Sequence, residues 1–462
     1  MGKTRPFTML KEALLGTHQD FTEGNLNRAI VLLAIPMILE MAMESLFGIV
    51  DVFFVARLGA DAVSTVGLTE SLLTLVFGVA IGLSMATTAF VARRIGEKDR
   101  EGAANGAVQS IILGILVSLV VGAIGLTQAP RLLHMMGATP AIEANARYTQ
   151  LMLGGSAVIF LLFLINAIFR GAGDAALAMR TLWLANGINL VLDPCLINGW
   201  GPFPHLGVYG AAVATTTGRG IGVLFQLWQL GSTKNRLTVY ARQVRLNVPV
   251  MLRLLKVSAT GIVQFLLATA SWMALVRIVA TFGSAAVAGY TIAVRMLIFT
   301  ILPSWGLSNA AATLVGQNLG AGKPERAERS VYRTGFYNML YLGLVSIAFI
   351  FFPAPLVAIF TGEPAVVTTA MACLSIFGIA FLSYAWGMVL IQAFNGAGDT
   401  MTPTVLNFIA FWVFQIPVAW LLAMHFAMGP RGAFWAVPAA DVVLTSASLV
   451  MFRRGAWKRQ QI

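Results

Sequence analysis

The chain has 462 residues, of which 58% are hydrophobic and only 11% are charged, and its mean hydropathy is +0.80. Water-soluble domains average about 45–50% apolar and about 25% charged residues, so this composition excludes a soluble enzyme or a soluble binding module. The formal net charge is +12, which raises the question of where the basic residues lie.

Long apolar stretches recur along the whole chain, and many exceed the roughly 20 residues that cross about 30 Å of hydrocarbon. They predict an all-α integral membrane protein with twelve transmembrane helices, preceded by an interfacial helix around Phe7 to Leu15. The predicted helices of the first half are 30–55, 62–91, 103–128, 144–168, 177–198 and 207–230. Those of the second half are 250–281, 286–315, 331–360, 365–393, 402–427 and 432–452. The corresponding domains are an N-terminal tail (1–29), an N-lobe (30–232), a linker (233–249), a C-lobe (250–452) and a C-terminal tail (453–462).

Basic residues are concentrated in alternate loops. The two tails and the loops after the second, fourth, sixth and eighth predicted helices carry 24 of the 31 Lys and Arg residues. The opposite loops carry only Arg57, Arg131, Arg147 and Arg431. The positive-inside rule therefore predicts that both termini, and the linker, are cytoplasmic in an inner or plasma membrane. This asymmetry accounts for the net charge, so no nucleic-acid partner is expected.

Short sequence matches recur at a nearly constant spacing. The letters GAGD occur at residues 171–174 and again at 396–399, 225 positions later. "LGADAV" aligns with "FGSAAV" at an offset of 224, and the loop 92–103 aligns with 316–327 at the same offset. The chain is therefore predicted to contain two six-helix repeats. Since six is even, both repeats enter the membrane from the same side and are parallel about an axis along the membrane normal, with a substrate path between them.

The GAGD motif has a structural interpretation. Glycine allows turn conformations with positive φ, and Asp174 or Asp399 is expected to cap the N-terminus of the next helix. The motif thus indicates a fold feature and no chemistry.

Carboxylates inside a bilayer are costly and usually functional. The predicted helices hold Glu40, Glu44, Asp51, Glu70 and Asp193 in the first half, and only Asp441 in the second. The first three are spaced 4 and 7 residues apart, which places them within about 40° of one another on one helix face. That face is expected to look into the protein.

The segment "NLVLDP" places Asn189 and Asp193 one helical turn apart on one face. Pro194 cannot donate a hydrogen bond to the carbonyl of Leu190, so the helix should bend beside Asp193. A freed carbonyl next to a carboxylate suits a proton or cation site. For Asp51 and Asp193 the alternative is a buried structural hydrogen bond, and for the three glutamates it is cavity lining or pairing with arginine.

Arg219 and Asp441 occupy related positions near the ends of the sixth and twelfth predicted helices. One interpretation is an ion pair across the two halves. The other is that Arg219 extends its guanidinium to the membrane surface while its stem stays in apolar surroundings.

The sequence contains no enzyme signature. It has no Walker motif for ATP hydrolysis, and its four histidines are scattered in tails and outer loops. Cys195 and Cys373 are the only cysteines, so neither a disulfide framework nor a cysteine metal site is expected. We therefore expect no catalytic residues, no bound metal and no cofactor.

Several segments together resemble the multidrug and toxic compound extrusion (MATE) family. They are "IPMILEMAMESLFGIVDVFFVARLGADAVSTVGL", "NLVLDPCLI", "GQNLGAGKPERAE" and "GAGDTMTPT", and the resemblance covers nearly the whole chain. It implies two six-helix lobes that form a V-shaped cleft, and antiport of organic, often cationic, compounds against H⁺ or Na⁺. In prokaryotic members a cluster in the N-lobe carries the ion. The residues that fall on this cluster here are Asp51, Tyr148, Asn189, Asp193 and Thr215.

The C-lobe departs from the family pattern. Some members carry a Glu in the seventh helix and an Asp in the tenth, whereas the seventh helix here offers only Gln264, Thr269 and Ser271. Coupling is therefore expected in the N-lobe, with H⁺ as the usual ion and Na⁺ as an alternative. Glu40, Glu44, Glu70 and Asp441 remain candidates for lining the substrate cavity.

The predicted function is thus secondary export of organic, cationic amphipathic compounds by alternating access of two lobes. The predicted partners are small organic molecules and membrane lipid, and a monomer is expected to suffice. Two other functions remain open at this point: a flippase for lipid-linked oligosaccharides, and a membrane-embedded acyl- or glycosyltransferase.

Overall fold

The computed structural model describes residues 6–17 and 19–460, and within these the regular elements are all helical. The first half contains α1 (Pro6–Leu15), α2 (Leu26–Ala56), α3 (Ala60–Gly96), α4 (Arg100–Met135), α5 (Pro140–Glu143), α6 (Ala146–Gly154), α7 (Ser156–Ala172), α8 (Ala175–Asn198) and α9 (Val208–Leu230). The second half contains α10 (Val248–Ala280), α11 (Ser284–Gly320), α12 (Pro324–Phe351), α13 (Pro353–Ala358), α14 (Pro364–Ala397), α15 (Met401–Asn407), α16 (Ile416–Trp420) and α17 (Pro430–Arg454). Short η segments are η1 (Ala241–Gln243), η2 (Phe408–Gln415), η3 (Leu421–His425) and η4 (Ala456–Arg459).

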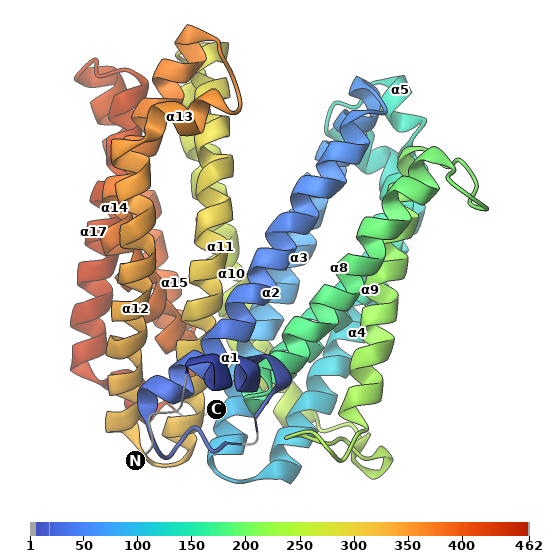
Figure 1. Ribbon diagram of the computed structural model, residues 1–462, viewed down its shortest axis with the longest axis vertical. Helices are drawn as coiled ribbons and strands as arrows, with labels where there is room; N and C mark the ends of the chain where they lie inside the picture. Colours follow the sequence, from blue (N-terminus) through green and yellow to red (C-terminus); the bar gives the residue numbers. More distant parts are fainter. Residues whose placement is uncertain (1–5, 18, 461–462) are drawn as a thin grey trace.

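Each of the twelve predicted spans corresponds to a helix or to consecutive helices. Over the described residues, eleven of these spans are long and apolar enough to cross a membrane. The remaining span, the sixth in chain order, is α9. It is less apolar because Arg219 and several Thr and Gly residues lie in it, yet it has 23 residues and runs beside α8 (Figure 1). The predicted helix near the N-terminus is present as α1, and its Phe7 and Leu15 side chains are exposed.

The predicted bounds of the ninth span were wrong. We expected 331–360, whereas α12 runs over Pro324–Phe351. The first turns of α12 are charged and precede the apolar stretch from which the span was predicted. Charged residues limit the part of a helix that can lie in the membrane, but they do not end the helix. Pro353 follows and cannot continue the backbone hydrogen bonds of α12, so the chain breaks there and a short helix begins.

The helices form two arms that diverge toward one end of the molecule, whereas both termini lie at the other end (Figure 1). One arm is built from α2 to α9 and the other from α10 to α17; we call them the N-lobe and the C-lobe. The lobes meet where α2 packs on α11 and α3 packs on α10 and α11. In each lobe, the first two long helices thus form the junction, and the remaining helices support them from outside.

The internal repeat predicted from the sequence is visible in the helices. α3 and α11 both have 37 residues, and they begin and end at positions 224 residues apart. In the two GAGD motifs, Gly173 and Gly398 both end a helix with φ of 85°, the left-handed conformation that glycine adopts at low cost. Asp174 is the N-cap residue of α8, and Asp399 Oδ1 accepts a hydrogen bond from the Thr402 amide at 3.1 Å.

The C-terminal ends of α3 and α11 approach each other so closely that each presents a glycine to the other. A Cβ atom on Gly96 would overlap the carbonyl oxygen of Gln317, and a Cβ atom on Gly320 would overlap that of Arg93. Both neighbours are backbone atoms, which cannot move aside as a flexible side chain would. These glycines are related by the repeat, so the closed end of the V is a symmetric contact of backbone on backbone.

Gly320→Ala is expected to lower the free energy of unfolding by about 1–3 kcal/mol, since the added methyl forces the two helices apart. Thermal unfolding of the detergent-solubilised protein would measure the loss. Gly343→Ala is the matched control, because a Cβ there would meet only Leu382 Cδ2 at 3.6 Å. Equal stability of the Gly320 variant and wild type would show that the junction tolerates separation.

Residues 19–25, which we call the strap, connect α1 to α2 across the closed end. Arg236, which follows α9, donates to the carbonyl of Gln19 and lies 4.4 Å from the ring of Phe21. Arg326, in the first turn of α12, donates to the carbonyls of Glu23 at 2.8 Å and Phe21 at 3.2 Å. The strap is therefore held by side chains of both halves of the chain.

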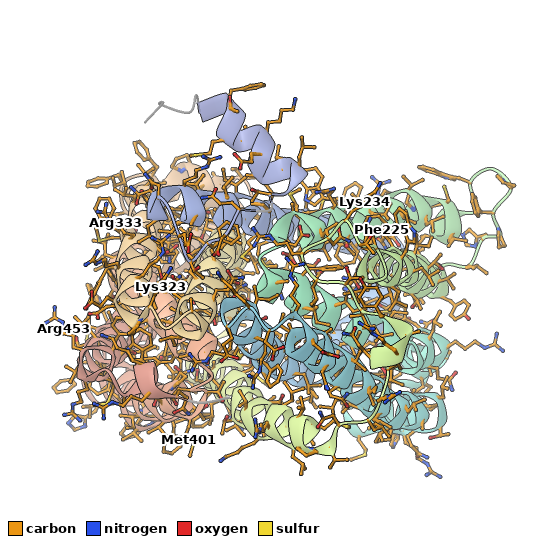
Figure 2. All side chains as sticks on the ribbon, turned by 90° about the horizontal axis from the view of Figure 1, so that it is seen from below. Phe225, Lys234, Lys323, Arg333, Met401 and Arg453 are labelled. Atoms are coloured by element: carbon orange, nitrogen blue, oxygen red, sulfur yellow. The ribbon has the colours of Figure 1, made fainter. Side chains whose placement is uncertain are left out.

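The end that carries the termini is rich in basic residues. Figure 2 looks onto this end and shows Lys234, Lys323, Arg333 and Arg453 around it. These belong to the loops and tails in which the sequence places most Lys and Arg residues. The structure thus gathers at one end the loops that the charge pattern assigns to one side of the membrane.

Candidate functional site

Four of the five predicted coupling residues come together inside the N-lobe, from α2, α8 and α9. Asn189 Nδ2 donates to Thr215 Oγ1 at 3.0 Å and, at 3.5 Å, to Asp193 Oδ1. The Asp51 side chain lies within hydrogen-bonding reach of Asp193. Three helices thus contribute two carboxylates, an amide and a hydroxyl to one site.

Two oxygen atoms of this cluster are buried and receive no hydrogen bond from the residues that the structure describes: Asn189 Oδ1 and Asp193 Oδ2. Asp193 is fully buried and Asn189 is 2% exposed. A buried acceptor without a donor is costly, and a proton or a cation with oxygen ligands would satisfy these atoms. Pro194 lies inside α8 directly after Asp193, as expected from the sequence, and it cannot donate to the Leu190 carbonyl.

Tyr148, the fifth predicted residue, lies on α6 and is 4% exposed. Its phenol is within electrostatic range of Asp51 and Asp193. It also belongs to the apolar core that packs α3 against α6 and α7. Tyr148 therefore forms part of the wall around the two aspartates.

A central cavity lies between the lobes and is open to solvent, with about 1110 Å³ of space not occupied by protein atoms. The N-lobe contributes Glu40, Glu44, Arg170 and Arg219 to its lining, while the C-lobe contributes residues of α11 and α14, among them Trp305. Glu40 and Glu44 therefore line a cavity, while their contact with substrate stays a prediction. Each of them lies beside an arginine, so the carboxylates of the central cavity are balanced by positive charge.

The predicted alternatives for Arg219 were both wrong. Its guanidinium is buried and lies 3.9 Å from Glu44 Oε1, and it also faces the rings of Phe47 and Phe77 at 5.7 and 5.8 Å. It neither pairs with Asp441 nor extends to the membrane surface. The acid on α2 is a closer partner than the one on α17, because α2 and α9 belong to the same lobe.

Arg170 was assigned to a cytoplasmic loop, and the structure places it instead near the end of α7 as a partner of Glu40. Glu40 Oε1 accepts hydrogen bonds from Arg170 Nη1 at 2.8 Å and Asn166 Nδ2 at 3.1 Å. Asn166 Oδ1 in turn accepts one from Gln226 Nε2 at 2.7 Å. The spacing of Asn166 and Arg170, one helical turn apart, was the available signal.

A second cavity lies inside the C-lobe and encloses about 1330 Å³ of empty space; we call it the C-lobe cavity. Asp441 lines it, together with Gln264 and several aromatic side chains. It shares Met85, Trp305 and Gln392 with the central cavity, so the two cavities are neighbours. Asp441 thus faces a cavity, and its contact with substrate stays a prediction.

Glu70 behaves differently from the other predicted cavity residues. It lies on α3 with an exposed side chain and lines neither the central nor the C-lobe cavity. Its assignment to the substrate cavity stays a prediction. The side chains of α3 that do reach the central cavity, such as Ser84 and Thr88, lie about four turns further along the helix.

Comparison with known proteins places this architecture in a family. The MatE family model matches the chain twice, over residues 36–195 and 261–421. The two matches begin 225 residues apart, in agreement with the repeat.

Relatives align over nearly the full length. A probable multidrug resistance protein NorM of Thermotoga maritima is 28% identical, with 95% of this chain and 94% of the relative covered. An FAD transporter of Shewanella oneidensis is 24% identical over 93% of this chain and 95% of the relative. Among solved structures, MATE in the straight conformation aligns with a TM-score of 0.89 at 26% identity, covering 95% of this chain and 98% of the other.

An outward-facing conformation of a multidrug resistance MATE family transporter aligns equally well, with a TM-score of 0.89, 26% identity and the same coverage. These relatives are transporters, which excludes an enzyme. The double family match, the repeat and the V-shaped pair of lobes lead to one conclusion: the chain belongs to the MatE family of multi-pass membrane transporters.

Proposed function

We propose that the protein is a secondary antiporter that exports organic, cationic amphipathic compounds in exchange for H⁺, with Na⁺ as the alternative coupling ion. The observation that carries the proposal is the pair of Asp51, which is partly exposed, and Asp193, which is buried, next to the oxygen atoms of Asn189 and Asp193 that receive no hydrogen bond from the described residues. The relatives named as multidrug resistance proteins support export of organic compounds. The same relatives do not favour an oligosaccharide flippase.

The chemistry of this pair explains why an ion is required. Two carboxylates within hydrogen-bonding reach of each other repel when both are charged, and burial strengthens that repulsion. A proton shared by the pair, or a cation held between them and the Asn189 and Thr215 oxygens, removes it. Loss of the ion restores the repulsion, which favours a different arrangement of α2 and α8. No cofactor is needed besides the coupling ion.

The shape of the molecule supports alternating access. The two lobes diverge at the end opposite the termini (Figure 1), and the basic end in Figure 2 is the side that the positive-inside rule assigns to the cytoplasm. In this proposal the structure represents an outward-open state in the inner membrane, and a single chain contains both lobes that must move. Binding of the ion in the N-lobe then favours release of the substrate to the outside.

The proposal is tested with purified protein in vesicles that contain a fluorescent cationic dye. A proton gradient alone is expected to drive dye movement against its concentration gradient, and a Na⁺ gradient alone is not. Movement driven only by Na⁺ would retain the antiporter and replace the ion. No movement under either gradient, with the protein shown to be folded and inserted, would overturn the proposed function.

A further inference from the structure

The wall of the C-lobe cavity contains an acidic residue, Asp441, that does not belong to the proposed coupling site. Asp441 lies on α17 and is 5% exposed. Among the described residues that line this cavity it is the one carboxyl side chain, and the lining includes no Lys or Arg; no described group donates a hydrogen bond to it or forms an ion pair with it. A lone carboxylate removed from water is costly unless a partner compensates it.

Further acceptors point into the same space. Gln264, on α10, is 5% exposed and its Oε1 is buried without a donor. Asn407 and Gln415, both buried, line the cavity from the two ends of η2, a π-helical segment. Such segments are rare and occur frequently at functional sites, because they displace side chains from the regular helical positions.

Aromatic rings form much of the remaining wall. They are Phe265, Trp272, Trp305, Phe377, Phe381, Tyr384 and Phe411. The ring of Trp272 meets that of Phe377 edge-on, with 6.1 Å between the centroids, and Tyr384 is within electrostatic range of Asp441. The negative faces of such rings attract cations, most strongly where water is excluded.

The central cavity differs from the C-lobe cavity in charge. In the central cavity, Arg170 and Arg219 lie beside Glu40 and Glu44, so a cationic substrate finds no uncompensated carboxylate there. In the C-lobe cavity, Asp441 has no basic partner among the described lining residues. A bulky cation is therefore attracted more strongly to the C-lobe cavity.

We propose that the C-lobe cavity is a binding site for bulky organic cations, with Asp441 as the counter-ion and the aromatic rings as the walls. The inference rests on the proposed function in that it names the site of the cationic substrate. It assigns substrate charge recognition to the C-lobe and ion coupling to the N-lobe, on separate carboxylates.

Two probes of the same shape and opposite charge test the proposal. Tetraphenylphosphonium is a permanent cation and tetraphenylborate a permanent anion, so neither changes its charge with pH. Equilibrium binding of each to the purified protein is measured in detergent, without a gradient. Wild type is expected to bind the cation more tightly, and Asp441→Asn is expected to weaken cation binding about tenfold or more while leaving anion binding unchanged.

Controls separate this site from general electrostatics and from the coupling site. Glu363→Gln removes one exposed negative charge from the same lobe and should leave both affinities unchanged. Trp272→Leu removes one aromatic wall and should weaken cation binding without altering the charge. Asp51→Asn should retain cation binding even where it abolishes coupled transport, so the failure of coupling and the failure of this site are distinguishable.

Unchanged cation affinity in folded Asp441→Asn protein would overturn the proposal. Equal affinity of wild type for the two probes would do the same, and this result does not depend on any variant folding. If wild type transports no dye but binds the cation in a manner that depends on Asp441, the proposed antiport would be overturned and the binding site would be supported.

Discussion

Asp51→Asn and Asp193→Asn are each expected to reduce gradient-driven dye efflux to the rate seen in vesicles without protein. Asparagine keeps the shape of a protonated carboxyl group but cannot release or take up a proton, so the site remains in one charge state. In both variants the amide can still occupy the hydrogen-bonding position between α2 and α8, and folding should be preserved. Initial rates of efflux from vesicles under a proton gradient measure the effect.

Asp61→Asn is the matched control, because Asp61 is exposed in the first turn of α3. This variant is expected to transport the dye at the wild-type rate. Circular dichroism and the elution volume in size-exclusion chromatography report whether each variant is folded. Efflux against a concentration gradient by both variants would show that neither aspartate carries the ion.

Arg170→Met should lower the free energy of unfolding by about 3–5 kcal/mol, the usual effect of leaving one member of a buried ion pair without its partner. Glu40 is 2% exposed and Arg170 13% exposed in their side chains. Without the guanidinium, the hydrogen bond from Asn166 is the one that the Glu40 carboxylate retains among the described residues. Denaturant-induced unfolding in mixed micelles measures the loss.

The double variant Glu40→Met with Arg170→Met should recover most of that stability, since apolar side chains of similar volume often replace a buried ion pair without loss. Arg329→Ala provides the exposed comparison. Its pair with Glu325 is at 3.8 Å and largely exposed, and its loss should cost at most about 1 kcal/mol. A loss of similar size in the Arg170 and Arg329 variants would contradict the role assigned to the buried pair.

The part of the N-lobe cluster on α8 could be predicted because its signals are local, whereas Tyr148 and Thr215 were expected only from the resemblance to the MATE family. Asn189, Asp193 and Pro194 are neighbours in one apolar stretch, and a carboxylate in such a stretch has few other uses. The fold could be predicted for a similar reason. Membrane helices appear in the sequence as long apolar stretches, and the two repeats share short sequence matches at a nearly constant spacing.

The partners of the glutamates could not be predicted from the sequence. Glu40 and Arg170 are 130 residues apart, and the charge of Arg170 places it equally well in a loop or in the last turn of a helix. Glu44 and Arg219 are also far apart in the sequence, and they come together because α2 lies next to α9 in the folded chain. Charge balance in the central cavity is therefore a property of tertiary structure.

The π-helical segment η2 was also beyond prediction. Its sequence, "FIAFWVFQ", has the apolar composition of any membrane helix, and the wider turn depends on how α10 and α17 pack against it. The same composition is compatible with a regular helix. Only the structure shows that this segment turns Phe411 and Gln415 toward the C-lobe cavity.

The strap couples the N-terminal segment to the population of conformations that the lobes adopt. Arg236 and Arg326 hold neighbouring carbonyls of one short stretch of backbone, and these arginines lie in opposite halves of the chain. In the alternating access proposed above, parting of the lobes at this end is expected to break the hydrogen bonds between the strap and one of the two arginines. Its hydrogen bonds therefore add to the free-energy difference between the two states, and the ligand or ion that drives inward opening has to overcome them. We therefore expect the sequence between α1 and α2 to influence the rate and balance of the proposed transport cycle from a position remote from both cavities.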